Sequence, residues 1–118
     1  MKNTVFYLQT CDTSKRIIKD LGLDSGFVLR EIKSNQITPQ ELDEMKELAG
    51  SYEALFSRRS RQFAAKKLKG VDLSEAQYRE LILEEYTFLK RPVTILDGKI
   101  FVGNSKKEIE RLGVALEK

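Results

Sequence analysis

Residues 4–18 of the 118-residue chain decide the fold, and they read Thr-Val-Phe-Tyr-Leu-Gln-Thr-Cys-Asp-Thr-Ser-Lys-Arg-Ile-Ile. The first five are β-branched, aromatic or aliphatic, which is typical of a short buried strand. A polar loop follows, and its last three residues all favour a helix N-cap: Asp12, Thr13 and Ser14. Apolar residues then repeat at helical spacing as far as Gly22, where the helix is expected to end.

Further strands and a last helix extend this beginning. Residues 27–32 form a second apolar run, so the first third of the chain predicts a β-loop-α-β unit with parallel strands. Residues 92–102 predict a hairpin, because Asp97-Gly98 is typical of a type I′ turn. An amphipathic helix with Ile109, Leu112 and Leu116 follows.

The middle of the chain, about residues 35–88, is predicted to be all-helical. Thr38-Pro39-Gln40-Glu41 begins one helix. A second is expected from Leu55 to Leu68, and a third after Ser74 that includes Tyr86. Because we find no linker and no repeat, we expect a single domain over 1–118 with a helical insertion, and an α/β fold class.

Composition excludes several functions. The chain is 41% hydrophobic and 33% charged with a net charge of +3, which is ordinary for a globular domain. It has one cysteine and no histidine, so a Cys/His zinc site and a Cys–His nucleophile pair are impossible within it. We see no signal peptide and no apolar run long enough for a membrane span, and we expect a cytoplasmic protein without bound cofactor or metal.

The lone thiol, Cys11, is the first candidate for chemistry. It lies between a strand and a helix N-terminus, where the helix dipole stabilises a thiolate and free N–H groups can bind an oxyanion. Lys15 and Arg16 add positive charge in the first turn. The alternative is a small buried hydrophobic residue, as free cysteines usually are, but the polar neighbours of Cys11 favour a functional thiol.

Two arginine segments are the other candidates. Arg58, Arg59 and Arg61 belong either to a solvated basic face or, for one of them, to an anion site above Cys11. Arg91-Pro92 begins the predicted hairpin, and its peptide bond could be cis. The local sequence alone favours a trans proline at the first residue of a strand.

The chain resembles the arsenate reductase (ArsC) family of the glutaredoxin-coupled type, with its relatives the Spx regulators and the small YffB-like proteins. The resemblance rests on four segments: Cys11-Asp12-Thr13-Ser14-Lys15, Ser57–Phe63, Leu89–Val93 and Val102–Ile109. It implies a thioredoxin-like (glutaredoxin-like) fold with a four-stranded mixed sheet, and a cis Pro92. It also implies that Cys11 is the nucleophile, that Lys15, Arg59 and Arg91 bind a small oxyanion with Thr13 and Ser14, and that glutathione or glutaredoxin acts as external reductant.

Three positions depart from the arsenate reductase pattern. Leu8-Gln9 stands in place of an Asn-Pro pair, Asp12 replaces the loop glycine, and Gly103 stands where a third arginine is expected. The sequence therefore predicts a thiol-dependent reductase of arsenate, another small oxyanion or a disulfide, with no direct nucleic-acid or membrane contact. The alternatives are an Spx-like regulator that binds RNA polymerase without a Cys-x-x-Cys switch, since Ser14 replaces the second cysteine, or a member that has lost activity.

Overall fold

The chain divides into two compact units in the computed structural model, which describes residues 1–117. The first unit contains Met1–Gln36 and the chain from Arg91 onward, and the second is Ile37–Lys90. The second unit occupies nearly the range predicted for the helical insertion. The expectation of a single domain over 1–118 stays a prediction.

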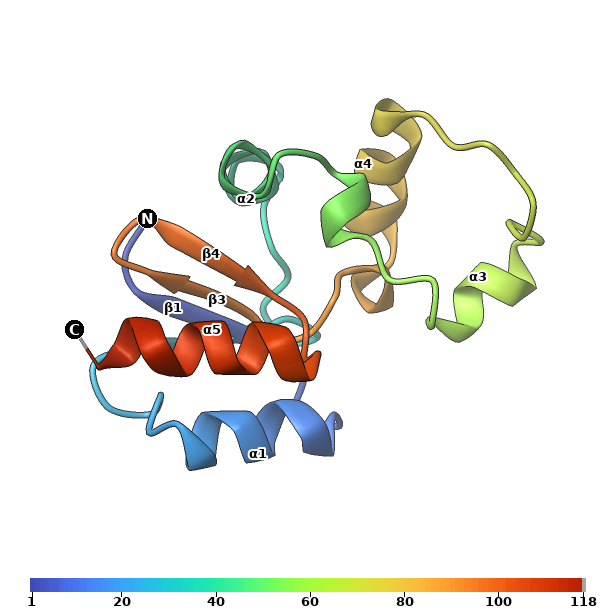
Figure 1. The fold of residues 1–118 in the computed structure, drawn as a ribbon. Coiled ribbons are helices and arrows are strands. Elements are labelled where there is room, and N and C mark those ends of the chain that lie inside the picture. The colour runs from blue at the N-terminus through green and yellow to red at the C-terminus, as the bar shows by residue number, and fades with distance from the viewer. Residues whose placement is uncertain (118) are drawn as a thin grey trace. The chain divides into compact units, whose positions relative to one another are not determined.

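A four-stranded mixed sheet forms the centre of the first unit (Figure 1). Its elements are β1 (Thr4–Tyr7), α1 (Asp12–Asp20), β2 (Val28–Glu31), β3 (Val93–Leu96), β4 (Lys99–Val102) and α5 (Lys106–Leu116). The strand order is β2-β1-β3-β4, with β1 parallel to β2 and antiparallel to β3, and β3 antiparallel to β4. A βαβ half joined to a ββα half is the thioredoxin-like arrangement, so the predicted α/β fold class is confirmed.

Two backbone features shape the second half of this sheet. Asp97 and Gly98 both have positive φ angles, 50° and 77°, as a type I′ turn between β3 and β4 requires. The Arg91–Pro92 peptide bond ahead of β3 is cis, whereas the local sequence alone favoured trans.

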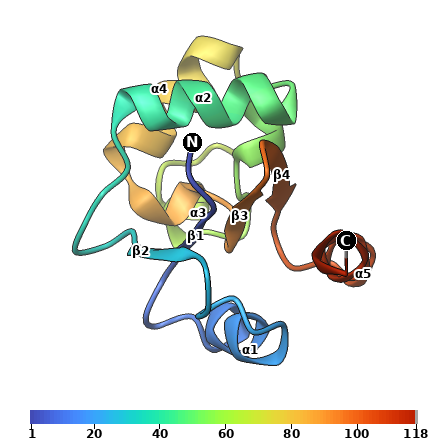
Figure 2. The same cartoon turned by 90° about the vertical axis from the view of Figure 1, so that its left-hand side faces the viewer.

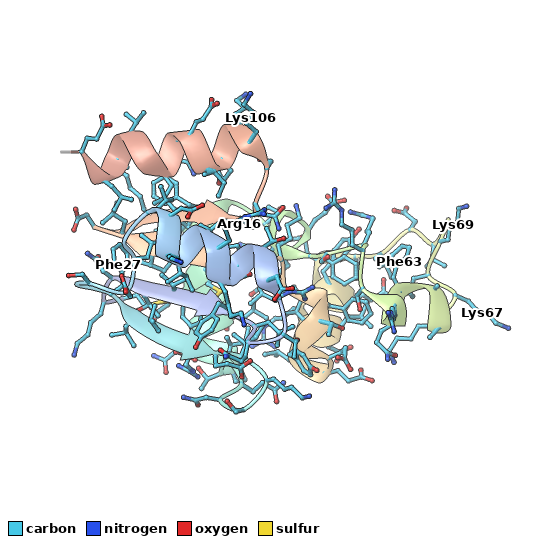
Figure 3. All side chains as sticks on the ribbon, turned by 90° about the horizontal axis from the view of Figure 1, so that it is seen from below. Arg16, Phe27, Phe63, Lys67, Lys69 and Lys106 are labelled. Carbon is cyan, nitrogen blue, oxygen red and sulfur yellow. The ribbon has the colours of Figure 1, made fainter. Side chains whose placement is uncertain are left out.

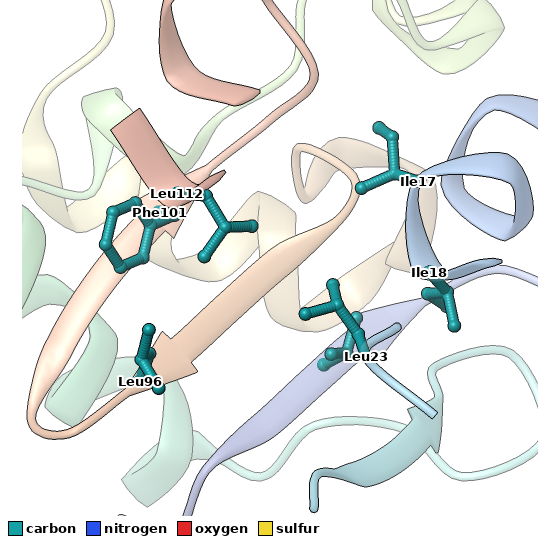
Figure 4. Packing of buried hydrophobic residues seen from close by; sticks show 7 residues of the cluster. Ile17, Ile18, Leu23, Leu96, Phe101 and Leu112 are labelled. Carbon is teal, nitrogen blue, oxygen red and sulfur yellow. The ribbon is translucent and has the colours of Figure 1, made fainter. Parts of the chain in front are cut away.

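The core of the first unit lies between the sheet and two helices that cover the same face, α1 and α5 (Figures 1 and 2). Ile17 and Ile18 of α1 and Leu112 of α5 meet Val5 of β1 in one apolar cluster (Figure 4). Leu23, Leu96 and Phe101 complete its buried side chains. The apolar side chains of α1 that recur at helical spacing, at positions 17, 18 and 21, therefore face the sheet.

We predict that Leu112→Ala destabilises the protein by about 3 kcal/mol, because it removes buried methyl groups and leaves a cavity. Val114→Ala on the same helix is the matched control, since Val114 is 57% exposed, and should change stability by less than about 0.5 kcal/mol. Urea unfolding of both variants measures this. Equal losses for the two substitutions would contradict the packing described.

Every helix of the second unit is short. They are α2 (Pro39–Ala49), η1 (Glu53–Leu55), α3 (Arg61–Ala65), α4 (Glu75–Glu84) and η2 (Tyr86–Phe88). α2 begins with the predicted capping box of Thr38 and Glu41, and ends at Gly50 in the left-handed conformation.

The continuous helix expected from Leu55 to Leu68 is wrong. A single 3₁₀ turn ends at Leu55, and α3 has only five residues. The intervening backbone pairs with a distant segment instead: Ser57 N donates to the carbonyl of Phe88, and Lys90 N donates to that of Leu55. Phe56 also stacks on Phe88, with ring centroids 4.9 Å apart. These long-range contacts override the local helical pattern.

The helix expected to include Tyr86 ends earlier, because the chain leaves α4 at Glu85. The Glu85 side chain accepts a hydrogen bond from the backbone N–H of Thr87 and so begins η2. Tyr86 is the first residue of that 3₁₀ turn.

An ion pair joins α2 to α4 within the second unit. Arg79 donates from Nε and Nη2 to both carboxylate oxygens of Asp43, at 2.8 and 3.2 Å, and the Tyr52 hydroxyl donates to the same carboxylate. The hydrogen bonds from Arg79 and Tyr52 lower the pKa of Asp43 to about 2. A depressed carboxyl pKa stabilises the fold above the unfolded-state value of about 4, and this contribution is lost as the pH falls toward 2.

Asp43→Asn should therefore be less stable than the wild type at pH 7, and the difference between the two should shrink between about pH 4 and about pH 2. Urea midpoints across this range measure it. Glu44→Gln, an exposed neighbour in α2, is the control and should follow the wild type. A constant difference down to pH 2 would contradict the role of Asp43.

Candidate active site

Strand pairing brings three loops together at one end of the sheet. Phe6, near the end of β1, pairs with Val93 at the start of β3, and Val93 pairs with Val102 at the end of β4. The loop after β1, the Arg91-Pro92 segment before β3 and the Gly103-Asn104 segment after β4 therefore lie at the same end. Sequence positions near 11, 91 and 104 meet there.

Cys11 is itself the N-cap residue of α1. The sequence favoured Asp12, Thr13 or Ser14 for this position. The chain instead turns one residue earlier, because Cys11 N donates to the carbonyl of Leu8 at 2.9 Å. A thiolate at this position would be the acceptor for the free N–H groups of the first turn.

Ser14, three residues on, faces the sulfur. Its side chain is fully buried, and its hydroxyl donates to Cys11 Sγ at 3.2 Å. Partial burial raises the pKa of the Cys11 thiol, but the Ser14 hydroxyl, the Ser14 backbone N–H and the Arg91 guanidinium outweigh it. The pKa of Cys11 is therefore lowered from its usual value, and the thiolate is favoured.

Arg91 comes from the loop before β3, and its guanidinium helps to lower the pKa of the Cys11 thiol. Its backbone is held by β4's exit loop: Gly103 N donates to the carbonyl of Pro92 at 2.9 Å, and Asn104 Nδ2 donates to the carbonyl of Arg91 at 3.2 Å. Of the residues predicted for the site, the structure thus brings Cys11, Ser14 and Arg91 together.

The side chains of the other residues predicted for the site show no hydrogen bond to Cys11 in the described part of the chain. Thr13 and Lys15 lie in the first turn of α1, and Lys15 is exposed. Arg16, the other cation of that turn, is also exposed (Figure 3). No hydrogen bond or ion pair of these three side chains is seen within residues 1–117, so the binding of an anion by Thr13 and Lys15 stays a prediction.

Arg59 belongs to the second unit, where it is exposed just ahead of α3. Its role beside Cys11 stays a prediction. Its neighbour Arg58 has a structural role, donating to Glu53 at 3.1 Å and to the Tyr78 hydroxyl at 2.7 Å. Lys67 and Lys69 lie in the loop after α3 (Figure 3).

Sequence reasoning missed two residues that support the thiol loop. Glu31, at the end of β2, accepts from the backbone N–H of Gln9 at 2.8 Å and so ties the loop before Cys11 to the neighbouring strand. Asn104 holds Arg91 as described above. Nothing in the sequence around either residue predicts its role. Each one bonds a backbone group of a segment distant in sequence, which the register of the strands brings near.

Gly103 has a φ of +85°, a conformation that disfavours any residue with a Cβ. Open space surrounds the position, so the requirement is conformational and not steric. An arginine there, as the arsenate reductase pattern would have, would strain this backbone. The glycine that replaces the third arginine of the arsenate reductase pattern therefore suits the backbone conformation of this loop.

The described residues, 1–117, contain no group of three or more His, Cys, Asp or Glu side chains able to hold a metal ion. Nor do they contain a helix with the length and apolarity that crossing a bilayer requires.

The fold and site define a thioredoxin-like protein with one thiol at a helix N-terminus. Residues 6–112 match the model of the ArsC family, and the chain belongs to that family. No curated protein sequence matches it.

Solved structures with the same fold cover nearly the whole chain. A protein from Bacteroides fragilis described as related to the ArsC family is 22% identical, with a TM-score of 0.79 over 95% of this chain and 98% of its own. An arsenate reductase related protein from Brucella melitensis is 25% identical, with 0.70 over 94% and 93%. The arsenate reductase from Vibrio cholerae is 14% identical, with 0.77 over 94% and 97%.

Ser14→Ala should raise the pKa of Cys11, because the thiolate loses its nearest hydroxyl donor. The rate of alkylation by iodoacetamide, followed from pH 4 to 10, gives this pKa. Thr10→Ala is the control, since Thr10 is exposed beside Cys11. An unchanged profile in Ser14→Ala would contradict the assigned contact.

Proposed function

We propose that this protein is a thiol-dependent reductase in which Cys11 is the nucleophile. The observation that supports it best is the Ser14 hydroxyl, which donates to the sulfur at 3.2 Å, together with the Arg91 guanidinium, which also lowers the pKa of the thiol. Both favour the thiolate, which is the reactive form of cysteine. A buried structural cysteine needs neither donor.

The proposed reaction on a disulfide has two steps. The Cys11 thiolate attacks one sulfur, a new S–S bond forms to Cys11, and the other sulfur leaves as a thiolate that Arg91 and the start of α1 can stabilise. One thiol from solution then attacks the captured sulfur of the mixed disulfide and releases Cys11 as a thiolate. The captured thiol and the external thiol leave joined as a new disulfide, so their oxidation supplies the two electrons that free the other thiol of the substrate, and Cys11 ends unchanged.

The resolving thiol must come from another molecule, because the chain has a single cysteine. Glutathione, or a glutaredoxin that uses it, is the reductant that family membership suggests. We propose it as an external partner and not as a bound cofactor.

We propose that the site takes a disulfide or a singly charged oxyanion in preference to the dianion of arsenate, which makes up much of arsenate at neutral pH. Asp12 places a negative charge in the first turn of α1, next to Cys11. Gly103 supplies no cation after the hairpin. A dianion there would meet one carboxylate more and one guanidinium fewer than the arsenate reductase pattern provides. One charge-assisted hydrogen bond contributes about 1.5–3 kcal/mol, so the loss is large.

The direct test incubates the protein with a glutathione mixed disulfide of a small thiol, or with arsenate, in the presence of glutathione. We expect turnover of the disulfide, a Cys11–glutathione adduct by mass spectrometry and no turnover by Cys11→Ser. Absence of the adduct and of turnover with both substrates would contradict the proposal. If the protein then retained RNA polymerase from a lysate, the regulator alternative would be supported.

Asp12→Gly should increase arsenate reduction several-fold, because it removes the carboxylate adjacent to Cys11 in the sequence and restores the residue that the family pattern has there. Initial rates of arsenite formation measure this. Asp20→Asn, at the far end of α1, is the matched control and should leave the rate unchanged. Equal rates for Asp12→Gly and the wild type would show that Asp12 does not exclude arsenate.

A further inference from the structure

We propose that Asn104 is a positioning residue that holds the backbone of Arg91 so that its guanidinium stays on Cys11. The inference rests on the proposed role of Cys11 as nucleophile. Asn104 acts on the thiol only through Arg91.

The contact is a side chain to backbone hydrogen bond between two loops. Asn104 Nδ2 donates to the carbonyl oxygen of Arg91 at 3.2 Å, and the preceding residue, Gly103, donates from its backbone N to the carbonyl of Pro92 at 2.9 Å. Consecutive residues of one loop thus hold consecutive carbonyls of the other. The second of these bonds survives any side-chain change, whereas the first depends on the Asn104 amide.

Asn104 is free for this role because its neighbour caps the helix. Asparagine is itself a favoured N-cap residue, but Ser105 occupies the N-cap of α5 and accepts from Glu108 N at 3.2 Å. The Asn104 side chain instead points back across the loop to Arg91. An exposed amide that makes no capping bond and reaches a residue of the site is the observation on which the proposal depends.

The far end of the loop is fixed to the sheet. Glu108, in the first turn of α5, accepts from Val102 N at 2.8 Å and pairs with Arg111, which lies over the Phe101 ring at 4.2 Å. The start of α5 is therefore tied to the end of β4. Asn104 extends this support to Arg91, whose guanidinium is one of the groups that lower the pKa of Cys11.

The test compares Cys11 alkylation profiles of Asn104→Ala and Asn104→Leu with the wild type. Leucine is close to asparagine in size, and neither alanine nor leucine has a side-chain donor. Both variants should therefore raise the apparent pKa of Cys11 by about half a unit, a change in free energy somewhat smaller than the net contribution of one typical hydrogen bond. Ser105→Ala is the control for a merely structural effect. It should lower the melting temperature through loss of the cap and leave the Cys11 pKa unchanged.

A double-mutant cycle shows whether Asn104 acts through Arg91. In an Arg91→Ala background the Asn104 substitutions should produce no further shift of the Cys11 pKa. Unchanged profiles for both Asn104 variants, or an equal shift with and without Arg91, would overturn the proposal. Absence of reductase activity in the wild type would contradict the proposed function instead. The pKa measurements do not depend on that activity, so the two failures can be told apart.

Discussion

The antiparallel pairing of β1 with β3 is the constraint on which the site depends. Because Phe6 is opposite Val93, the chain leaves β1 at the end of the sheet where it enters β3. Cys11 and Arg91, 80 positions apart in sequence, reach each other for that reason. The pairing of Val93 with Val102 adds the Gly103-Asn104 loop to the same end. A slip of one residue in either pair would turn Val93 to the other face and move these loops apart.

Opposing electrostatic effects meet at the sulfur. Partial burial disfavours a thiolate, while the Ser14 hydroxyl, the backbone N–H of the first turn and Arg91 favour it, and the second group prevails. Asp12 occupies the same turn, where a carboxylate is favourable for the helix dipole and unfavourable for an incoming dianion. The same first turn therefore stabilises a nucleophile and limits the charge of its substrate.

Local sequence signals predicted the sheet, the type I′ turn and the helix that begins at Thr38, because each depends on neighbouring residues. They failed between Leu55 and Leu68, where pairing with Phe88 and Lys90 replaces the expected helix. In the candidate site, residue type and family resemblance pointed to Cys11, Ser14 and Arg91, which the structure places near one another and whose roles stay predictions. Asn104 and Glu31 were missed because they act on backbone atoms that only the register of distant strands brings within reach.

The site lowers the pKa of Cys11 and so favours the thiolate. A titration of thiolate absorbance in the ultraviolet tests it most directly, since the chain has one cysteine and Cys11→Ser supplies the blank. We expect a midpoint clearly below the ordinary thiol value of about 8.5. A midpoint at or above that value would show that burial outweighs Ser14 and Arg91, and Cys11 would then not be an activated thiol.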